Sequence, residues 1–293
     1  MVRALQEPMR LYDFAWPERF SSRASAHGVL CYFDTQTAEK GRGAPLVFLH
    51  ALGTNFTQWR HVAEELAPHR RLIGVDLPGC GHSVKTRRPW QLTDMTQAVL
   101  GLLADLQIER ACLAGHSFGG RVALELALRH PERVSGLLLL NSAGLMRYPP
   151  LWHRLGPRLL KPWLVAPVMV ALAVPILSAI VAHPSSPSGE FAASVQERFR
   201  PEFAWDFAAH ACPLLPALLS DVVDEVTALR LPIEVVWGAN DRLLRFSRVQ
   251  KALDRLPGAR LTLLSDCGHM PNFEAPAAVA HAALRLFARV DGP

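Results

Sequence analysis

The chain has 293 residues, half of them hydrophobic, and this combination excludes a disordered protein and a small disulfide-linked scaffold. Its length is sufficient for one large α/β domain or for two smaller domains. The net charge of +5 arises from 31 basic and 26 acidic residues. The basic residues are mostly scattered arginines without interleaved aromatics, so we expect no nucleic-acid partner.

The cysteines and the amino-terminal segment indicate the compartment. The five cysteines are far apart and form no C-x-x-C pair, which predicts reduced thiols and no zinc site. Residues 1–20 contain charges and prolines every few positions, so we expect no signal peptide and a cytoplasmic protein. Because regular metal-ligand spacing and a G-x-G-x-x-G motif are both lacking, we predict no metal and no dinucleotide cofactor.

Short apolar runs alternate with amphipathic stretches from residue 45 onward, which is typical of βαβ units and a parallel sheet covered on both faces. We expect an antiparallel edge strand at 28–33, followed by the alternating elements. The predicted strands are 46–49, 72–75, 111–114, 134–140, 233–237 and 261–264. The predicted helices are 58–66, 92–106, 121–129, 250–256 and 275–288. This pattern predicts an α/β core formed by residues 1–145 and 226–293.

The alternation stops between residues 146 and 225, a proline-rich stretch that we predict to be an inserted helical cap. Within it, residues 162–189 carry no charge, and 20 nearly apolar residues are enough to span a bilayer. A single crossing would separate the serine motif described next from the later acidic and histidine residues. We therefore interpret the segment as cap helices, with attachment to a membrane surface as an alternative.

The strongest motif is G-H-S-F-G at 115–119, between a predicted strand and a predicted helix. A serine hydroxyl becomes a useful nucleophile only when it is exposed, oriented and deprotonated by a neighbour. A sharp strand-to-helix turn exposes the serine, and small residues on both sides make such a turn sterically feasible. The context therefore predicts Ser117 as a nucleophile.

The chain resembles the α/β-hydrolase family over about residues 25–290. Four landmarks carry the resemblance: the serine motif, H-A-L-G at 50–53, D-L-P-G-C-G-H-S at 76–83, and W-G-A-N-D at 237–241 followed by G-H at 268–269. The resemblance implies a mostly parallel central sheet flanked by helices. A serine nucleophile excludes the dehalogenases and epoxide hydrolases of this fold, which use aspartate instead.

The family order of nucleophile, acid and base implies a triad of Ser117, Asp241 and His269. Both partners of the serine follow predicted parallel strands, so they should lie at the carboxyl edge of the sheet, where open α/β sheets bind ligands. Asp266 is the rival acid because it is three residues from His269, but Asp241 has the W-G-x-x-D context.

The resemblance also implies an oxyanion hole made by the backbone N–H groups of Leu52 and Phe118. Here Ala51 stands where the family usually has glycine; if that position required a positive φ, alanine would cost about 1 kcal/mol. The stretch L-G-T at 52–54, with Trp59 following, is similar to the corresponding loop of enol-lactone hydrolases. His116 differs from the asparagine that usually precedes the serine in C–C bond hydrolases.

These observations predict a serine hydrolase that cleaves a hydrophobic carboxylic ester. The uncharged run at 164–181 would line the acyl pocket, or would form only the core of the cap. Three alternatives remain open: an enol-lactone or C–C bond hydrolase, a ligand-binding member without catalysis, and a lipid hydrolase at a membrane interface. The sequence leaves the oligomeric state and the natural substrate open.

Overall fold

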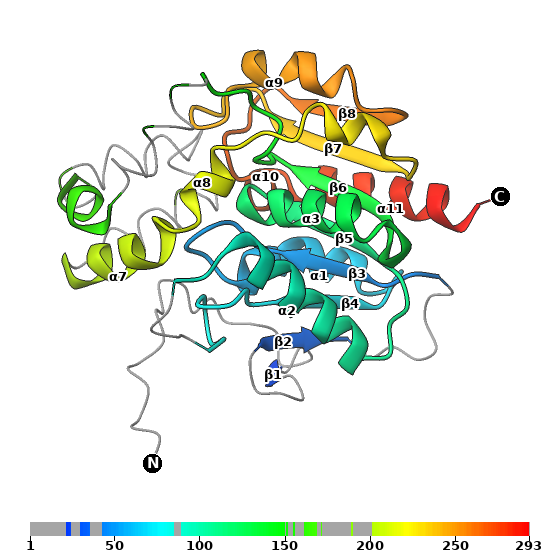
Figure 1. Ribbon diagram of the computed structural model, residues 1–293. Helices are drawn as coiled ribbons and strands as arrows, with labels where there is room; N and C mark the ends of the chain where they lie inside the picture. The colour runs from blue at the N-terminus through cyan, green and yellow to red at the C-terminus, as the bar shows by residue number, and fades with distance from the viewer. Residues whose placement is uncertain are drawn as a thin grey trace.

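The computed structural model of the protein describes residues 22–24, 30–35, 43–84, 89–149, 151, 155, 161–168, 171, 189 and 201–292. Within these residues, eight strands form one sheet in the order β1-β2-β4-β3-β5-β6-β7-β8 (Figure 1). The strands are β1 (Ser22–Ala24), β2 (Cys31–Asp34), β3 (Leu46–Leu49), β4 (Leu72–Val75), β5 (Ala111–His116), β6 (Val134–Leu140), β7 (Ile233–Gly238) and β8 (Ala259–Leu264).

The helices of the described residues alternate with the strands. They are η1 (Phe56–Trp59), α1 (Arg60–Leu66), α2 (Leu92–Asp105), α3 (Phe118–Arg129), η2 (Pro131–Arg133), α7 (Pro201–Ala211), α8 (Leu215–Leu218), η3 (Glu225–Ala228), α9 (Phe246–Leu253), α10 (Pro271–Glu274) and α11 (Pro276–Asp291). The predicted α/β class with a mostly parallel sheet is therefore confirmed.

Strand direction places the loops that carry chemistry on one edge of the sheet. The pairs from β4 across to β8 are all parallel, whereas β1 and β2 are antiparallel additions. Because parallel strands all end on the same side, the segments after β3, β5, β7 and β8 share one edge. The antiparallel strand predicted at 28–33 is β2, and β1 lies outside it, so β1 is the outermost strand.

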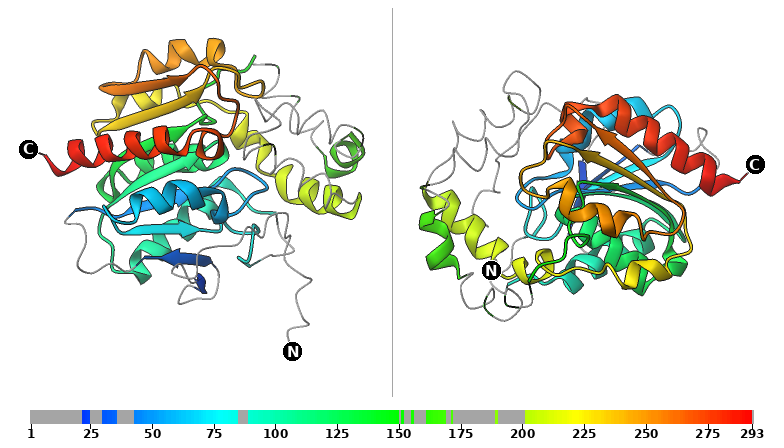
Figure 2. Two further views of the ribbon diagram at one scale, coloured as in Figure 1. Left: turned by 180° about the vertical axis from the view of Figure 1, so that it is seen from behind. Right: turned by 90° about the horizontal axis from the view of Figure 1, so that it is seen from above.

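Two apolar cores sandwich the sheet (Figures 1 and 2). On one face, β-strand side chains pack with α2 and α3, and on the other face they pack with α1 and α11. Burial of this apolar surface is the main favourable contribution to folding. Strand β8 is different: it forms the other outer edge, and its Leu261 and Leu263 are 44% and 45% exposed.

Some element boundaries differ from the prediction for local reasons. Helix α3 begins at Phe118 rather than at 121, because the chain turns directly from β5 into the helix. Helix α9 begins at Phe246 rather than at 250, and its buried residues Val249 and Leu253 continue a helical spacing from that start.

The cap predicted at 146–225 is described only in part, and the rest lies outside the described residues, as does most of the apolar run at 164–181. Residues 162–168 are helical and pack on α7 through Ala166, which contacts Ala208 and Cys212. Helix α7 in turn contacts the core, since the Phe207 ring packs directly on Gly53. None of the helices within the described residues is both long and apolar enough to cross a membrane.

Glu234 links the last helix to the sheet through a buried ion pair. It is fully buried on β7, and its two oxygens accept hydrogen bonds from Arg285 (3.0 Å) and Arg289 (2.9 Å) of α11. A carboxylate removed from water in this way is stable only while its partners remain in place. The ion pairs therefore fix α11 against β7.

We predict that Glu234→Gln lowers the free energy of unfolding by about 2 kcal/mol, because hydrogen bonds to charged groups are stronger than neutral ones. Urea denaturation followed by circular dichroism measures this. The exposed Glu64→Gln, which makes the same chemical change on α1, should leave the stability within about 0.5 kcal/mol. Equal stability of the two variants would contradict the prediction.

Candidate active site

Ser117 lies in a strained turn between β5 and α3. Its backbone has φ 52° and ψ −114°, a conformation that costs a non-glycine residue about 1–3 kcal/mol. Its carbonyl accepts from the N–H groups of Gly120 (3.0 Å) and Ala143 (3.0 Å), and its N–H donates to Leu140 (3.0 Å), so the surrounding backbone stabilises the turn. Ser117 is half-buried while both of its neighbours are buried. The turn thus presents this one side chain to the carboxyl edge.

Close packing explains why Gly119, the last residue of the G-H-S-F-G motif, is a glycine. A Cβ atom at Gly119 would lie 2.2 Å from the carbonyl oxygen of Leu49 at the end of β3. Such a contact is far inside van der Waals distance, so only glycine lets α3 start this close to β3. The small residue that the sharp turn requires after the serine is therefore present at position 119.

His269 and Asp241 are held together at the same edge. His269 Nδ1 donates to Asp241 Oδ2 at 2.7 Å, and both residues are buried. The carboxylate also accepts from Asn141 Nδ2 at 2.5 Å on that oxygen. Its other oxygen accepts from the backbone N–H groups of Leu243 and Leu244 at 2.8 and 2.9 Å. With Nδ1 used as the donor, Nε2 of His269 has the free lone pair.

The surroundings stabilise Asp241 in its ionised form. Burial alone would raise the pKa of the Asp241 carboxyl. The charge and hydrogen bond of His269, the Asn141 amide and the backbone N–H groups outweigh burial and lower that pKa to about 2. A permanently ionised carboxylate next to Nδ1 can orient the imidazole and stabilise its protonated form.

The rival acid Asp266 is exposed, and Nδ1 of His269 donates to Asp241 instead. The loop that carries His269 is fixed by Glu274, whose carboxylate accepts from the N–H groups of Gly268 (3.0 Å) and Met270 (3.3 Å). Glycine at position 238 permits this loop to approach β7, because a Cβ there would lie 1.9 Å from the Gly268 carbonyl oxygen. The structure therefore pairs His269 with Asp241 and not with Asp266.

The sequence interpretation did not identify Asn141, although its side chain is central to the site. It follows β6, donates to Asp241, and accepts from the N–H of Gly238 at 3.1 Å. It also has φ 38°, one of three positive values outside glycine in the described chain. A polar residue directly after the apolar strand 134–140 is the signal that could have identified it.

In the loop after β3, the hydrogen bonds of the Ala51 carbonyl determine where the N–H of Leu52 points. The Ala51 carbonyl oxygen accepts from His50 Nδ1 (2.7 Å) and from the Thr54 N–H (3.2 Å). Since the carbonyl and the following N–H of a trans peptide point in opposite directions, the Leu52 N–H points away from His50. Neither it nor the Phe118 N–H has an acceptor among the residues described.

The loop conformation also accounts for the alanine at position 51. Among the described non-glycine residues with positive φ, Ala51 is absent, and the left-handed position of this loop is Gly53, with φ 76°. Alanine therefore fits without the penalty considered from the sequence.

No hydrogen bond joins Ser117 to His269 among the described residues, although the residue before Ser117 contacts the histidine. The ring of His116, next to Ser117, lies 5.1 Å from the ring of His269 between centroids. Serine–histidine hydrogen bonds are often long in ligand-free enzymes and tighten when substrate binds. The structure thus brings Asp241 to His269 and presents Ser117 at the same edge of the sheet.

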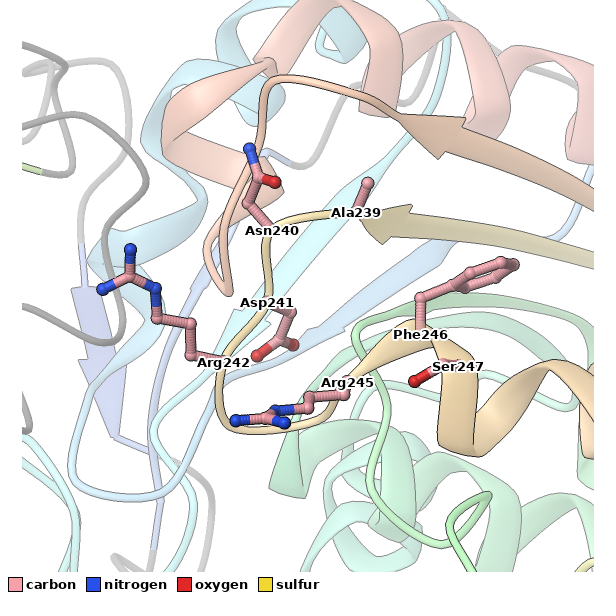
Figure 3. Close-up of a pocket in the computed structure, with 7 residues that line it drawn as sticks. All are labelled: Ala239, Asn240, Asp241, Arg242, Arg245, Phe246 and Ser247. Atoms are coloured by element: carbon pink, nitrogen blue, oxygen red, sulfur yellow. The ribbon is translucent and has the colours of Figure 1, made fainter.

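A cavity of about 650 Å³ lies beside Asp241, lined by residues 239–242 and 245–247 (Figure 3). The side chains of Arg242 and Arg245 both extend away from β7, and neither pairs with an acidic group among the described residues.

Within the part of the chain that the structure describes, one group of side chains could hold a metal ion. Cys31, Asp76 and His82 each place one ligand atom within 4.8 Å of the others. However, the oxygens of Asp76 accept from the N–H groups of Phe56 (2.8 Å) and His82 (2.9 Å), which ties together the loops after β3 and β4. We therefore assign the carboxylate a structural role rather than a metal.

With the geometry in place, the comparisons with known proteins identify the class. The model of the alpha/beta hydrolase family matches residues 46–282. The chain belongs to the alpha/beta hydrolase family.

Several relatives within the family are enzymes. The chain is 32% identical to a 2-hydroxymuconate semialdehyde hydrolase of Pseudomonas sp. (strain CF600), over 88% of this chain and 91% of that one. It is 30% identical to a pimeloyl-[acyl-carrier protein] methyl ester esterase of Aeromonas hydrophila, over 80% and 92%. It is also 32% identical to the dihydrolipoyllysine-residue acetyltransferase component of an acetoin cleaving system of Pseudomonas putida, over 80% of this chain and 60% of that one.

A solved structure agrees with these relatives. The enol-lactonase of Burkholderia xenovorans LB400 has a TM-score of 0.71 and is 25% identical, and the match covers 91% of this chain and 99% of that chain. The chain therefore belongs to a family that includes hydrolases of several kinds, and the reaction that we propose for it is considered below.

We predict that Asp241 contributes pH-dependent stability. Because its folded pKa lies below its ordinary value of 3.8, the contribution is complete above about pH 4 and is lost as the pH falls toward 2. The difference in free energy of unfolding between the wild type and Asp241→Asn should shrink by about 2 kcal/mol over this range. Urea titrations at stepped pH measure the difference. The exposed Asp254→Asn is the matched control, and a difference for Asp241→Asn that is independent of pH would refute the prediction.

Proposed function

We propose that the protein is a serine hydrolase that cleaves a hydrophobic carboxylic ester through an acyl-enzyme intermediate. The observation that carries the proposal is the 2.7 Å hydrogen bond between the buried residues Asp241 and His269. It lies at the edge of the sheet where Ser117, in its strained conformation, precedes α3. A base oriented by an ionised carboxylate, together with an exposed serine, is the arrangement that acyl transfer needs.

In the proposed mechanism, His269 Nε2 removes the Ser117 proton as Oγ attacks the substrate carbonyl. The Leu52 and Phe118 N–H groups stabilise the negative charge on the tetrahedral oxygen, which is usually a large contribution to catalysis. His269 then gives the proton to the leaving alcohol. Water attacks the acyl-enzyme with His269 again as base, and the acid product leaves. No metal and no cofactor takes part in this scheme.

The preference for an apolar substrate rests on what borders the oxyanion loop. The Phe207 ring of α7 packs on Gly53, one residue after the proposed donor Leu52. The same helix also approaches the loop after β4, where His210 Nε2 lies 3.4 Å from Cys80 Sγ. An acyl group held next to these residues would contact an aromatic ring and apolar cap side chains.

The second candidate function is hydrolysis of a C–C bond or of an enol-lactone by the same three residues. Two of the relatives are named as a 2-hydroxymuconate semialdehyde hydrolase and an enol-lactonase, and both remain alternatives to the simple ester. All these substrates present a carbonyl to the serine, so what separates them is the leaving group. A ligand-binding member without turnover is the remaining alternative, and labelling of Ser117 by a fluorophosphonate would argue against it.

We predict turnover of p-nitrophenyl esters with a maximum at one chain length between acetate and palmitate, and a loss of at least about 10³-fold in kcat for Ser117→Ala. Ser142→Ala, a buried serine near the turn, serves as the matched control and should retain most of the activity. If the folded wild type hydrolyses no ester of the series, the ester proposal fails, and lactones and C–C substrates are tested next.

We also propose that the cap contacts a lipid surface. Several apolar cap residues are exposed, among them Trp163 at 63%, Val168 at 53% and Trp205 at 46%. Tryptophan favours the boundary between lipid headgroups and acyl chains. Arg154, Arg158 and Lys161 precede the uncharged run in the sequence, which suits an anionic membrane.

The prediction is co-sedimentation with phosphatidylglycerol vesicles, weaker with phosphatidylcholine vesicles, and at least about a fivefold loss of binding in the double variant Trp163→Ser/Trp205→Ser. Leu261→Ser/Leu263→Ser on β8 removes exposed apolar side chains elsewhere and is the control. Binding that is equal for all three proteins, or absent in the wild type, would exclude the lipid contact.

A further inference from the structure

His116 occupies the variable position before the nucleophile, yet it is completely buried. It ends β5, and its ring lies between two loops rather than facing the exterior. Nε2 is 2.7 Å from the carbonyl oxygen of His269, and Nδ1 is 3.3 Å from Nε2 of Gln58. The ring thus contacts the loop of the proposed base directly.

The two partners determine which nitrogen of the ring carries the proton. A carbonyl oxygen can only accept, so Nε2–H must be the donor to His269. Nδ1 is then the acceptor for the Gln58 amide. Burial and the nearby His269 lower the pKa of His116 to about 3, so the ring is neutral, with one donor and one acceptor.

Gln58 extends this connection to the oxyanion loop. Its side-chain oxygen lies 2.8 Å from Thr54 Oγ1 and 3.4 Å from the N–H of Ala51. Its backbone carbonyl accepts from Asn272 Nδ2 at 2.7 Å, on the segment that follows His269. A continuous series of hydrogen bonds therefore runs from the carbonyl of His269 to Ala51 and Thr54, on either side of Leu52.

We propose that His116 is a positioning residue that, with Gln58, holds the base loop and the oxyanion loop at a fixed separation. This inference rests on the proposed function. The proton acceptor and the oxyanion donor act on atoms of the same transition state, and an error of about 1 Å in such an arrangement costs about 10²-fold in rate. Neither side chain touches the substrate, so the effect falls on the chemical step and not on binding.

The test compares His116→Leu, Gln58→Leu, the double variant and the wild type. We expect each single variant to lose about 10- to 100-fold in kcat with KM within about twofold, and the rate of Ser117 labelling by a fluorophosphonate to fall in parallel. The double variant should lose no more than His116→Leu alone, because one break already separates the loops. Losses that multiply, or kcat within about twofold of the wild type in folded variants, would overturn the proposal.

Gln58→Glu keeps the shape of the side chain and remains informative if the leucine variants do not fold. The ionised carboxylate that this substitution introduces cannot donate to Nδ1 of His116, whereas the protonated acid can. The kcat of Gln58→Glu at about pH 8 should therefore fall by about 10- to 100-fold, as in the leucine variants. Gln107→Glu is the matched control, on an exposed turn at the opposite end of β5, and its kcat should not change. A kcat of Gln58→Glu within about twofold of the wild type counts against the proposal.

An independent readout separates this inference from the proposed function. If the wild type neither hydrolyses esters nor is labelled at Ser117, the serine hydrolase proposal fails. The nitrogen chemical shifts of the His116 ring then decide the positioning role. The positioning role is supported if the shifts show a protonated Nε2 and an unprotonated Nδ1 in the wild type, and if these shifts change in Gln58→Glu. The opposite tautomer in the wild type refutes it.

Discussion

The site is organised around one buried negative charge. The Asp241 carboxylate is 2% exposed, and a group of this kind is tolerated in an interior only when donors surround it. Its donors come from three places in the chain: the loop after β6, its own loop, and the loop after β8. The carboxylate thus fixes the relative positions of three segments that are far apart in the sequence, and the orientation of His269 is a consequence.

The local features of this arrangement could be predicted from the sequence because their causes are local. The strand at 46–49 and the turn at Ser117 follow from apolar runs and from glycine spacing. The pairing of Asp241 with His269 was expected from the order of motifs. The structure shows that pairing, while the catalytic role of the triad and of the Leu52 and Phe118 N–H groups stays a prediction.

The contributions that were not predicted depend on contacts over long sequence separations. Asn141 donates to Asp241 across 100 residues, and His116 donates to the carbonyl of His269 across 153 residues. No periodicity or spacing records such pairs, and the sequence marks His116 only as the residue that precedes the serine. Likewise, only the strand order explains why apolar Leu261 is exposed, because β8 lies at the sheet edge.

The packing of α11 has a consequence for how the protein is made. This helix contributes Val279 and Leu286 to one core, where they meet Val62 and Leu66 of α1. A ribosome releases α1 roughly 200 residues before α11, so the part of that face that α11 covers stays open until this helix has been made. During that interval the growing chain exposes an apolar surface, which makes it prone to aggregation.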